Sequence, residues 1–209
     1  DNIYITYLSD VLEQIISGSK SVIYRDNIVL IVSRSSELSL QEQDMKEMVL
    51  FLKNNNIYCG ISRCFQELVD LKEYYQQSIK ALEYGKHMKK DEFVFLYEDF
   101  VLCHFIDMIS RNNDLGQLCH TSIFKLEEYD RKNNCSYMHT LYTFLKNSKK
   151  LIETANELHI HRNTLSYRLK SIEEIMGINL EDVDVILHLL FSFKIMQFMG
   201  KGGFMKNPA

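Results

Sequence analysis

LIETANELHIHRNTLSYRLKSIEEIMG, residues 151–177, is the stretch that decides how the C-terminal part of this chain folds. It is predicted to form a short helix, a tight turn and a second helix over residues 162–176. On a helical wheel of about 100° per residue, Leu165, Leu169 and Ile172 fall on one side of the second helix and must face a core. Polar side chains fall on the opposite side. This is how a helix-turn-helix presents a recognition helix to the major groove of DNA.

The polar side of the second helix supplies the candidate DNA contacts. Arg162 and Asn163 suit guanine and adenine, because both side chains can form bidentate hydrogen bonds with those bases. Arg168 falls closer to the core side, where it is predicted to clamp a phosphate or to join an ion pair. The predicted DNA-binding residues are His161, Arg162, Asn163, Thr164, Ser166, Tyr167, Arg168 and Lys170, with Lys149 and Lys150 ahead of the first helix.

Two residues near the turn bear on this interpretation. Ala155 is small where the first helix would cross the second, as close packing of the motif requires. His159 stands where many such motifs have glycine, and histidine tolerates a left-handed backbone better than most residues. The competing interpretation is an ordinary amphipathic helix pair with a solvated polar face.

Charge is distributed unevenly along the chain. The net charge is −4, yet residues 146–170 hold six Lys or Arg and two Glu. That segment therefore carries +4 and the remainder carries −8. A basic island on an acidic body fits a DNA-reading module attached to a part that does not contact DNA.

The composition is that of a soluble globular protein with one or two domains. No apolar run approaches the roughly 18 residues that span a bilayer, and no signal peptide opens the chain. We therefore expect a cytoplasmic protein without membrane contact. The five cysteines show no CxxC pair and are expected to be reduced thiols. Because the sequence lacks an initiating Met, we expect that an upstream region has been cut away.

The predicted fold class is α+β: a small mixed sheet with helices, followed by an all-α part. Residues 1–100 alternate between helical and strand patterns. They predict helices at Tyr4–Ser17, 41–55 and Leu68–Met88, a hairpin of Ser21–Arg25 and Ile28–Ser33 around an Asp26–Asn27 turn, and strands at Ile57–Arg63 and Phe93–Asp99. These strands are expected to form one small sheet covered on one face. Further helices are predicted at about 99–110, 114–130, 136–147, 151–158, 162–176 and 181–199. The predicted domains are 1–100, a helical connector at 101–135, a DNA-binding domain at 136–200 and a flexible tail at 201–209.

Three tracts carry a family resemblance: HRNTLSYRL (His161–Leu169), YDR (Tyr129–Arg131) and GINLED (Gly177–Asp182). They resemble the C-terminal module of the purine-catabolism and sugar-diacid regulators (PucR/CdaR type), a family of bacterial transcription factors. The turn also resembles the DNA-binding end of the factor-for-inversion-stimulation family. The resemblance implies that Arg162, Asn163 and Thr164 contact DNA. It also implies a homodimer, and an effector small molecule sensed by an N-terminal region that this sequence does not include.

The first hundred residues resemble the central domain of that family, which is related in fold to diguanylate cyclases (GGDEF type). In true cyclases the tip of the hairpin carries the glycines and acids that hold metal and nucleotide. Here the hairpin IYRDNIVLI (Ile23–Ile31) has no glycine pair, and Asp26 is its only acid. Without clustered carboxylates for Mg²⁺ we expect neither an enzyme nor a cofactor. The pair His159 and His161 lacks further ligands at a suitable spacing, so no metal site is expected.

The sequence thus favours a sequence-specific DNA-binding transcriptional regulator, with double-stranded DNA as its partner. A dimer would place two recognition helices about one DNA turn apart. The alternative is a nucleotide- or metabolite-binding signalling domain whose helical C-terminus docks a protein partner.

Overall fold

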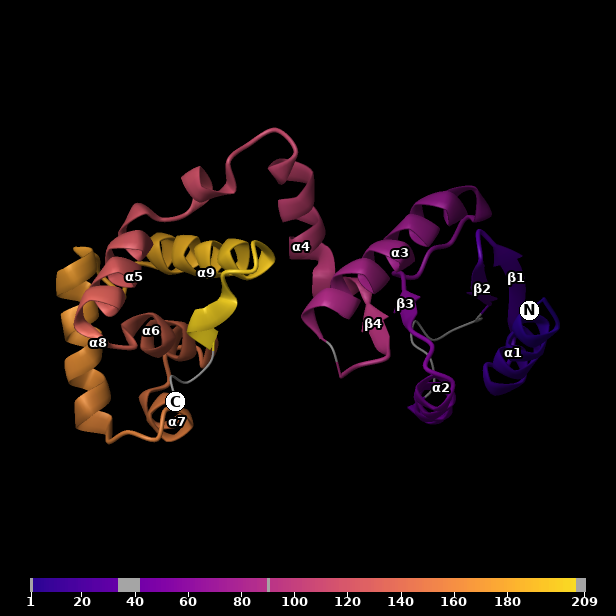
Figure 1. Ribbon diagram of the computed structural model, residues 1–209, viewed down its shortest axis with the longest axis horizontal. Coiled ribbons are helices and arrows are strands. Elements are labelled where there is room, and N and C mark those ends of the chain that lie inside the picture. Colours follow the sequence, from indigo (N-terminus) through magenta and orange to yellow (C-terminus); the bar gives the residue numbers. More distant parts are fainter. Residues whose placement is uncertain (1, 34–41, 90, 206–209) are drawn as a thin grey trace. The chain divides into compact units, whose positions relative to one another are not determined.

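The computed structural model describes residues 2–33, 42–89 and 91–205. The chain divides into two compact units, residues 1–101 and 102–209 (Figure 1). The model is mostly helical with small sheets, so the predicted α+β class is confirmed. Within the described residues, every helix is too short or too polar to cross a membrane.

The first unit alternates helices with short strands. Its elements are α1 (Asn2–Ile15), β1 (Ser19–Tyr24), β2 (Asn27–Val32), α2 (Glu42–Asn54), β3 (Cys59–Ile61), a 3-10 turn (Leu68–Asp70), α3 (Leu71–Met88) and β4 (Val94–Leu96). Helix α4 (Tyr97–Ser110) follows β4 directly and continues into the second unit. The start of the predicted helix 41–55 and the end of the tail 201–209 lie partly outside the described residues.

The predicted hairpin is confirmed, but its turn is displaced by one residue. Tyr24 lies opposite Asn27, so the two turn residues are Arg25 and Asp26. Both have a positive φ, 49° and 62°, and paired left-handed residues give the turn whose twist matches that of the strands. The predicted Asp26–Asn27 turn is therefore wrong. Asn27 belongs to β2 and donates a side-chain hydrogen bond to the Arg25 carbonyl at 2.9 Å.

The prediction of a single sheet is also wrong for the described residues. β1 pairs with β2 in an antiparallel sheet, and β3 pairs with β4 in a separate parallel sheet. One apolar core nevertheless lies against both sheets, and its fully or nearly fully buried members come from α1, the residue directly after it, and α2: Leu12, Ile16, Met48 and Leu52. On the opposite face, α3 packs so closely on β3 that a side chain at Gly60 would run into the Ser78 carbonyl oxygen. Among the described residues, the β1–β2 sheet and the β3–β4 sheet thus border the same core without being hydrogen-bonded to each other.

The regular elements in the described part of the second unit, residues 102–205, are all helices. After α4 come a 3-10 turn (Leu115–Leu118), α5 (Thr121–Asn133), α6 (Tyr137–Lys146), α7 (Leu151–Glu157), α8 (Arg162–Met176), α9 (Val183–Phe198) and a 3-10 turn (Gly202–Met205). Its core includes the side chains of Leu126, Leu141, Leu165, Ile172, Leu189 and Phe193, all buried to 1% exposure or less. These residues come from α5, α6, α8 and α9, so α8 is held by helices on its inner side.

Capping residues explain where the helices of this unit differ from expectation. The predicted helix at 114–130 is interrupted, because His120 has an extended backbone and its ring nitrogen caps α5 by accepting the Ser122 N–H. The last helix begins at Val183, two residues later than predicted, because Asp182 caps it. Near the C-terminus, the Phe204 ring packs against Phe193 at 5.0 Å between centroids, within the segment that the sequence assigned to a tail.

Candidate nucleic-acid interface

Helices α7 and α8 are joined by a tight turn that backbone hydrogen bonds stabilise. The turn residue His159 is left-handed, with φ of 54°, as its position in the motif requires. Its N–H donates to the Asn156 carbonyl at 3.1 Å, and the Ile160 N–H donates to the Ala155 carbonyl at 3.0 Å. Ala155 and Leu158 are buried where the two helices meet. The pair therefore has the geometry of a helix-turn-helix.

The inner side of α8 is apolar and packed, as the helical wheel predicted. Leu165 and Ile172 are fully buried and Leu169 is 8% exposed. Met176, one turn further on, extends the buried stripe. Gly177 then ends the helix with φ of 65°, and its N–H donates to the Glu173 carbonyl at 2.8 Å. Because one side of α8 is fixed in the core, the opposite side of the helix faces away from it.

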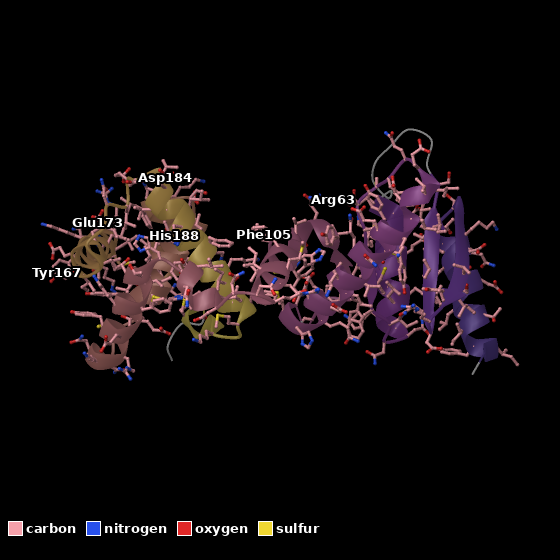
Figure 2. The ribbon with its side chains drawn as sticks, turned by 90° about the horizontal axis from the view of Figure 1, so that it is seen from above. Arg63, Phe105, Tyr167, Glu173, Asp184 and His188 are labelled. Carbon is pink, nitrogen blue, oxygen red and sulfur yellow. The ribbon has the colours of Figure 1, made fainter. Side chains whose placement is uncertain are left out.

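That opposite side is exposed and polar, and we call it the outer face of α8. Its members are the exposed residues Arg162, Asn163, Thr164, Ser166, Tyr167 and Lys170. Tyr167 is 70% exposed, and in Figure 2, where α8 is seen along its axis, it points away from the rest of the unit. The outer face thus offers one guanidinium, one carboxamide, one ammonium and three hydroxyl groups to a partner.

His161 caps the start of α8. Its Nδ1 accepts the Asn163 N–H at 3.2 Å, so in the neutral ring the proton sits on Nε2, a donor on an exposed side chain. Backbone N–H groups in the first turn of a helix lack partners within the helix. Together with the positive end of the helix dipole they favour an anion such as phosphate.

Three of the basic side chains among the predicted DNA-binding residues have side-chain partners inside the unit. Arg168 is half-buried, and its Nη1 donates to Thr140 Oγ1 at 3.3 Å, which ties α8 to α6. Lys149 pairs with Glu181 at 2.7 Å and Lys150 pairs with Glu153 at 3.0 Å. Exposed ion pairs contribute about 0–1 kcal/mol each, so both ammonium groups can exchange their partner for a phosphate at little cost.

Several basic side chains of residues 146–170 are therefore already paired with carboxylates, which the sequence alone does not show. Lys146 also pairs, with Glu157 at 3.0 Å. The Asn147 amide and this ammonium together hold the pKa of the Glu157 carboxyl below its usual value. Among the described residues, Arg162 and Lys170 take part in no ion pair. The unpaired positive charge therefore lies on α8 itself.

Two carboxylates that the sequence analysis did not single out hold this arrangement together. Asp130 accepts the N–H groups of Tyr137 and Met138 at 2.9 and 2.8 Å, so it caps α6 from the neighbouring helix. Glu173 accepts the Leu180 N–H at 2.8 Å beyond the end of α8. The tract Tyr129–Arg131 had marked the first of these positions only through family resemblance. Neither contact follows a local sequence rule, because each partner lies seven or eight residues away.

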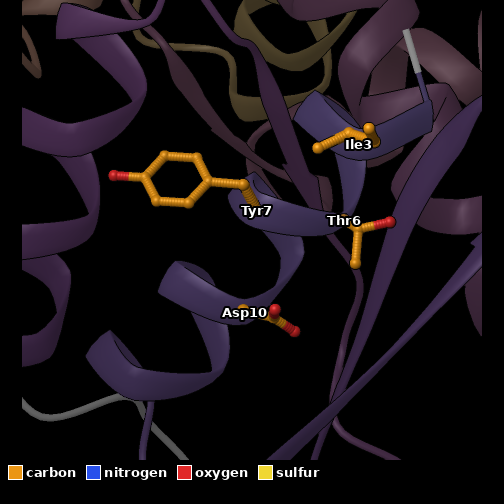
Figure 3. A pocket seen from close by; sticks show the side chains of 4 residues that line it. All are labelled: Ile3, Thr6, Tyr7 and Asp10. Carbon is orange, nitrogen blue, oxygen red and sulfur yellow. The ribbon is translucent and has the colours of Figure 1, made fainter.

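Within residues 2–33, 42–89 and 91–205, no group of three or more His, Cys, Asp or Glu side chains is arranged to hold a metal ion. A shallow depression on the first unit is lined by Ile3, Thr6, Tyr7 and Asp10, all from α1 (Figure 3). A depression on one face of a single helix cannot surround a small molecule.

Comparison with known proteins bears on this interface. Residues 137–195, from α6 into α9, match the family described as the PucR C-terminal helix-turn-helix domain. The chain is 26% identical to the purine catabolism regulatory protein of Bacillus subtilis over 79% of its length. It is 24% identical to the proline-responsive transcriptional activator PutR of the same organism over 82% of its length, and 26% identical to the carbohydrate diacid regulator of Escherichia coli over 58% of its length.

The chain spans 30%, 44% and 31% of the lengths of these three relatives. No solved structure matches it at a comparable level of significance. The matched residues contain α6, the whole helix-turn-helix and most of α9, and the relatives share the resemblance over much of the remaining chain. Residues 137–195 are therefore similar to the PucR C-terminal helix-turn-helix domain, and the chain as a whole is similar to regulators of the PucR/CdaR type.

Proposed function

We propose that this chain is the DNA-binding part of a transcriptional regulator and that the outer face of α8 reads base edges in the major groove. The observation that carries the proposal is the division of α8 into a buried apolar side and an exposed polar side, within a helix-turn-helix of the matched family. The relatives are themselves named as regulators or transcriptional activators. Such a role would place the protein in the cytoplasm, where bacterial DNA lies.

Each side chain of the interface has a distinct role in this proposal. Arg162 and Asn163, in the first turn of α8, would form the bidentate contacts with guanine and adenine. The Nε2–H of His161 and the hydroxyl groups of Thr164, Ser166 and Tyr167 would bind phosphate oxygens. The basic residues Lys149, Lys150 and Lys170 would add phosphate contacts that set the salt dependence of binding. Arg168 would act from behind, by fixing α8 on α6.

Two copies of the chain are proposed to bind together. Helix-turn-helix dimers place their recognition helices about 34 Å apart, one turn of DNA, on a palindromic or repeated site. A dimer also doubles an interface that is small in a single copy. Size-exclusion chromatography with light scattering, with and without a duplex that carries two half-sites, measures the stoichiometry directly.

The first unit is proposed to be a degenerate GGDEF-like domain with a regulatory role and no enzymatic one. At the tip of its hairpin, the turn residues Arg25 and Asp26 supply a single carboxylate. A tip of this kind lacks the clustered carboxylates that would hold the Mg²⁺ ion of a nucleoside triphosphate. Turnover of GTP by the purified chain, measured by pyrophosphate release, would contradict this part of the proposal.

A binding experiment tests the proposed function. Duplexes selected from a random pool by the purified chain should bind with an affinity that falls steeply as salt rises. Arg162→Ala and Asn163→Ala should each weaken binding to the selected duplexes. Lys53→Ala is the matched control, because it removes one exposed charge from α2 in the first unit and should leave binding unchanged. If no duplex is selected at moderate salt, the alternative function, a signalling domain whose helical part docks a protein, is favoured instead.

A further inference from the structure

The first half of α9 exposes an apolar stripe on the side of the helix that faces away from the core. Leu189 and Phe193 point inward and are buried to 1% exposure or less. On the opposite side, Val183 is 75% exposed, Leu187 66% and Leu190 38%. A helix that is apolar on all sides is normally buried on all sides. The sequence of α9 is therefore suited to a neighbour on its outer side.

Two side chains of α4 extend this stripe across the surface of the second unit. The Phe105 ring lies 6.4 Å from the Phe191 ring of α9, measured between centroids, and Phe191 follows Leu187 by one helical turn. Phe105 is 49% exposed, and Met108, three residues further along α4, is 59% exposed. Figure 2 labels Phe105 on α4 and Asp184 near the start of α9. We define the α4–α9 patch as Phe105, Met108, Val183, Leu187 and Leu190, none of which belongs to the outer face of α8.

The area of the patch matches what a dimer interface requires. A Leu, Phe or Met side chain that is about half exposed leaves on the order of 100 Å² of apolar surface in water, so the whole patch exposes on the order of 500 Å². The largest apolar patch on a monomeric protein is normally about 300–600 Å² and is often functional. A standard interface buries about 800 Å² per partner, of which roughly 60% is apolar. The patch therefore supplies the apolar area of one side of such an interface.

The charges along α9 favour a second copy of the same chain as the partner. The N-terminal end of the helix carries the exposed carboxylates of Asp182 and Asp184, and the far half carries the half-buried ammonium of Lys194. Among the described residues, Asp184 and Lys194 take part in no ion pair. Two antiparallel copies of α9 place the acidic end of each helix beside the basic half of the other. Opposite charges then meet at both ends of the pair.

The spacing of the stripe fits the same antiparallel arrangement. Val183, Leu187, Leu190 and Lys194 follow one another at intervals of four, three and four residues, the spacing of a seam between two helices. With a twofold axis between residues 188 and 189, Leu187 of one copy lies against Leu190 of the other. Val183 then lies against the aliphatic stem of Lys194. The stripe is thus complementary to itself, as an interface between identical copies must be.

We infer that a second copy of this chain covers the α4–α9 patch, with the two α9 helices antiparallel about a twofold axis. Phe105 and Met108 of each copy flank the seam and enlarge the buried area. The inference rests on the proposed function through its dimer, and it names the surface that forms the dimer. It requires no DNA, because the outer face of α8 takes no part in it.

Sedimentation equilibrium of the 209-residue chain without DNA tests the inference. The parent chain should dimerise reversibly. Leu187→Glu should raise the dimer dissociation constant at least about 100-fold, because it would bury a carboxylate against apolar side chains. Leu50→Glu is the matched control: Leu50 is 60% exposed on α2 in the first unit, so the same substitution there should leave the constant unchanged.

A charge exchange tests the antiparallel arrangement itself. Asp184→Lys and Lys194→Glu should each weaken the dimer, and the two substitutions in one chain should restore it, because the opposite charges then meet again. Failure of the double variant to recover would overturn the antiparallel pairing. A parent chain that stays monomeric up to its solubility limit would overturn the inference, as would a Leu187→Glu variant that dimerises as tightly as the parent.

DNA binding is measured separately, so that the two proposals can fail independently. Leu187→Glu should bind a duplex with a single half-site as tightly as the parent chain does, because Leu187 lies outside the outer face of α8. A chain that dimerises through Leu187 but selects no duplex would contradict the proposed function and leave this interface standing. A monomeric chain that binds single half-sites would do the reverse.

Discussion

At the scale of single residues, the polar side chains of α8 divide into those that we propose contact DNA and one that holds the helix. Arg162 and Asn163 are exposed in the first turn, and a bidentate base contact contributes about 1–3 kcal/mol. Arg162→Ala and Asn163→Ala should therefore each weaken binding to the selected duplex by about 10- to 100-fold. Fluorescence anisotropy at fixed salt measures the affinities. Unchanged affinity in both variants would show that the base contacts lie elsewhere.

Arg168 should behave differently, because its side chain donates to Thr140 on α6. Arg168→Ala should lower the free energy of unfolding of the second unit by about 1 kcal/mol, a typical value for one hydrogen bond. DNA binding should fall only as far as folding does. Urea unfolding followed by circular dichroism gives the stability, and Thr140→Val serves as the partner variant. Full stability combined with lost DNA binding would instead identify Arg168 as a phosphate contact.

At the scale of elements, the cap of α5 makes part of the stability depend on pH. Burial, and then the positive charge that His188 can carry, lower the pKa of His120 below its ordinary 6.5. The neutral ring that accepts the Ser122 N–H is thus the form that the fold prefers. The unfolded chain takes up this proton first as the pH falls, so the stabilisation is complete above pH 6.5 and is lost below it. His120→Asn keeps a capping acceptor and should flatten the decline in unfolding free energy between pH 7.5 and 5.5, while an unchanged decline would refute this assignment.

The end of α8 provides a second prediction at this scale. Gly177 has φ of 65° with no neighbouring atom within 4 Å of an added Cβ, so Gly177→Ala should cost only the strain of a left-handed residue, about 1–2 kcal/mol. Gly177→Asn should cost less, because asparagine tolerates this conformation. Thermal unfolding of both variants measures the difference. Equal destabilisation by alanine and asparagine would point to a cause other than backbone strain.

Local patterns in the sequence sufficed for α8 and not for the contacts that surround it. The buried stripe of Leu165, Leu169 and Ile172 and the stop at Gly177 follow from periodicity and backbone preference, and both are confirmed. The cap from Asp130 and the bond between Arg168 and Thr140 depend on packing between helices, which no local pattern records. The hairpin was found, but its turn was misplaced because Arg25 gives no sign of a left-handed conformation.

At the scale of the whole molecule, the basic residues that could contact DNA are concentrated in residues 146–170, and the remainder of the chain is acidic. The separate sheets of the first unit could not be foreseen, because strand pairing joins residues far apart in sequence.

Binding to DNA should depend on salt through the second unit alone. Lys150→Ala should weaken binding to every duplex alike and reduce the slope of log affinity against log salt by about 1. Lys53→Ala should leave that slope unchanged.

The base preference of Arg162→Ala tests the central claim most directly. Binding sites are selected from a random duplex pool with the parent chain, with Arg162→Ala and with Lys150→Ala, and the preferences at each base pair are compared. Arg162→Ala should lose the preference at one position of each half-site, because a side chain that reads a base specifies only that base. Lys150→Ala should keep the full preference at lower affinity. Identical base preferences in the parent chain and in Arg162→Ala would contradict the claim that the outer face of α8 reads DNA.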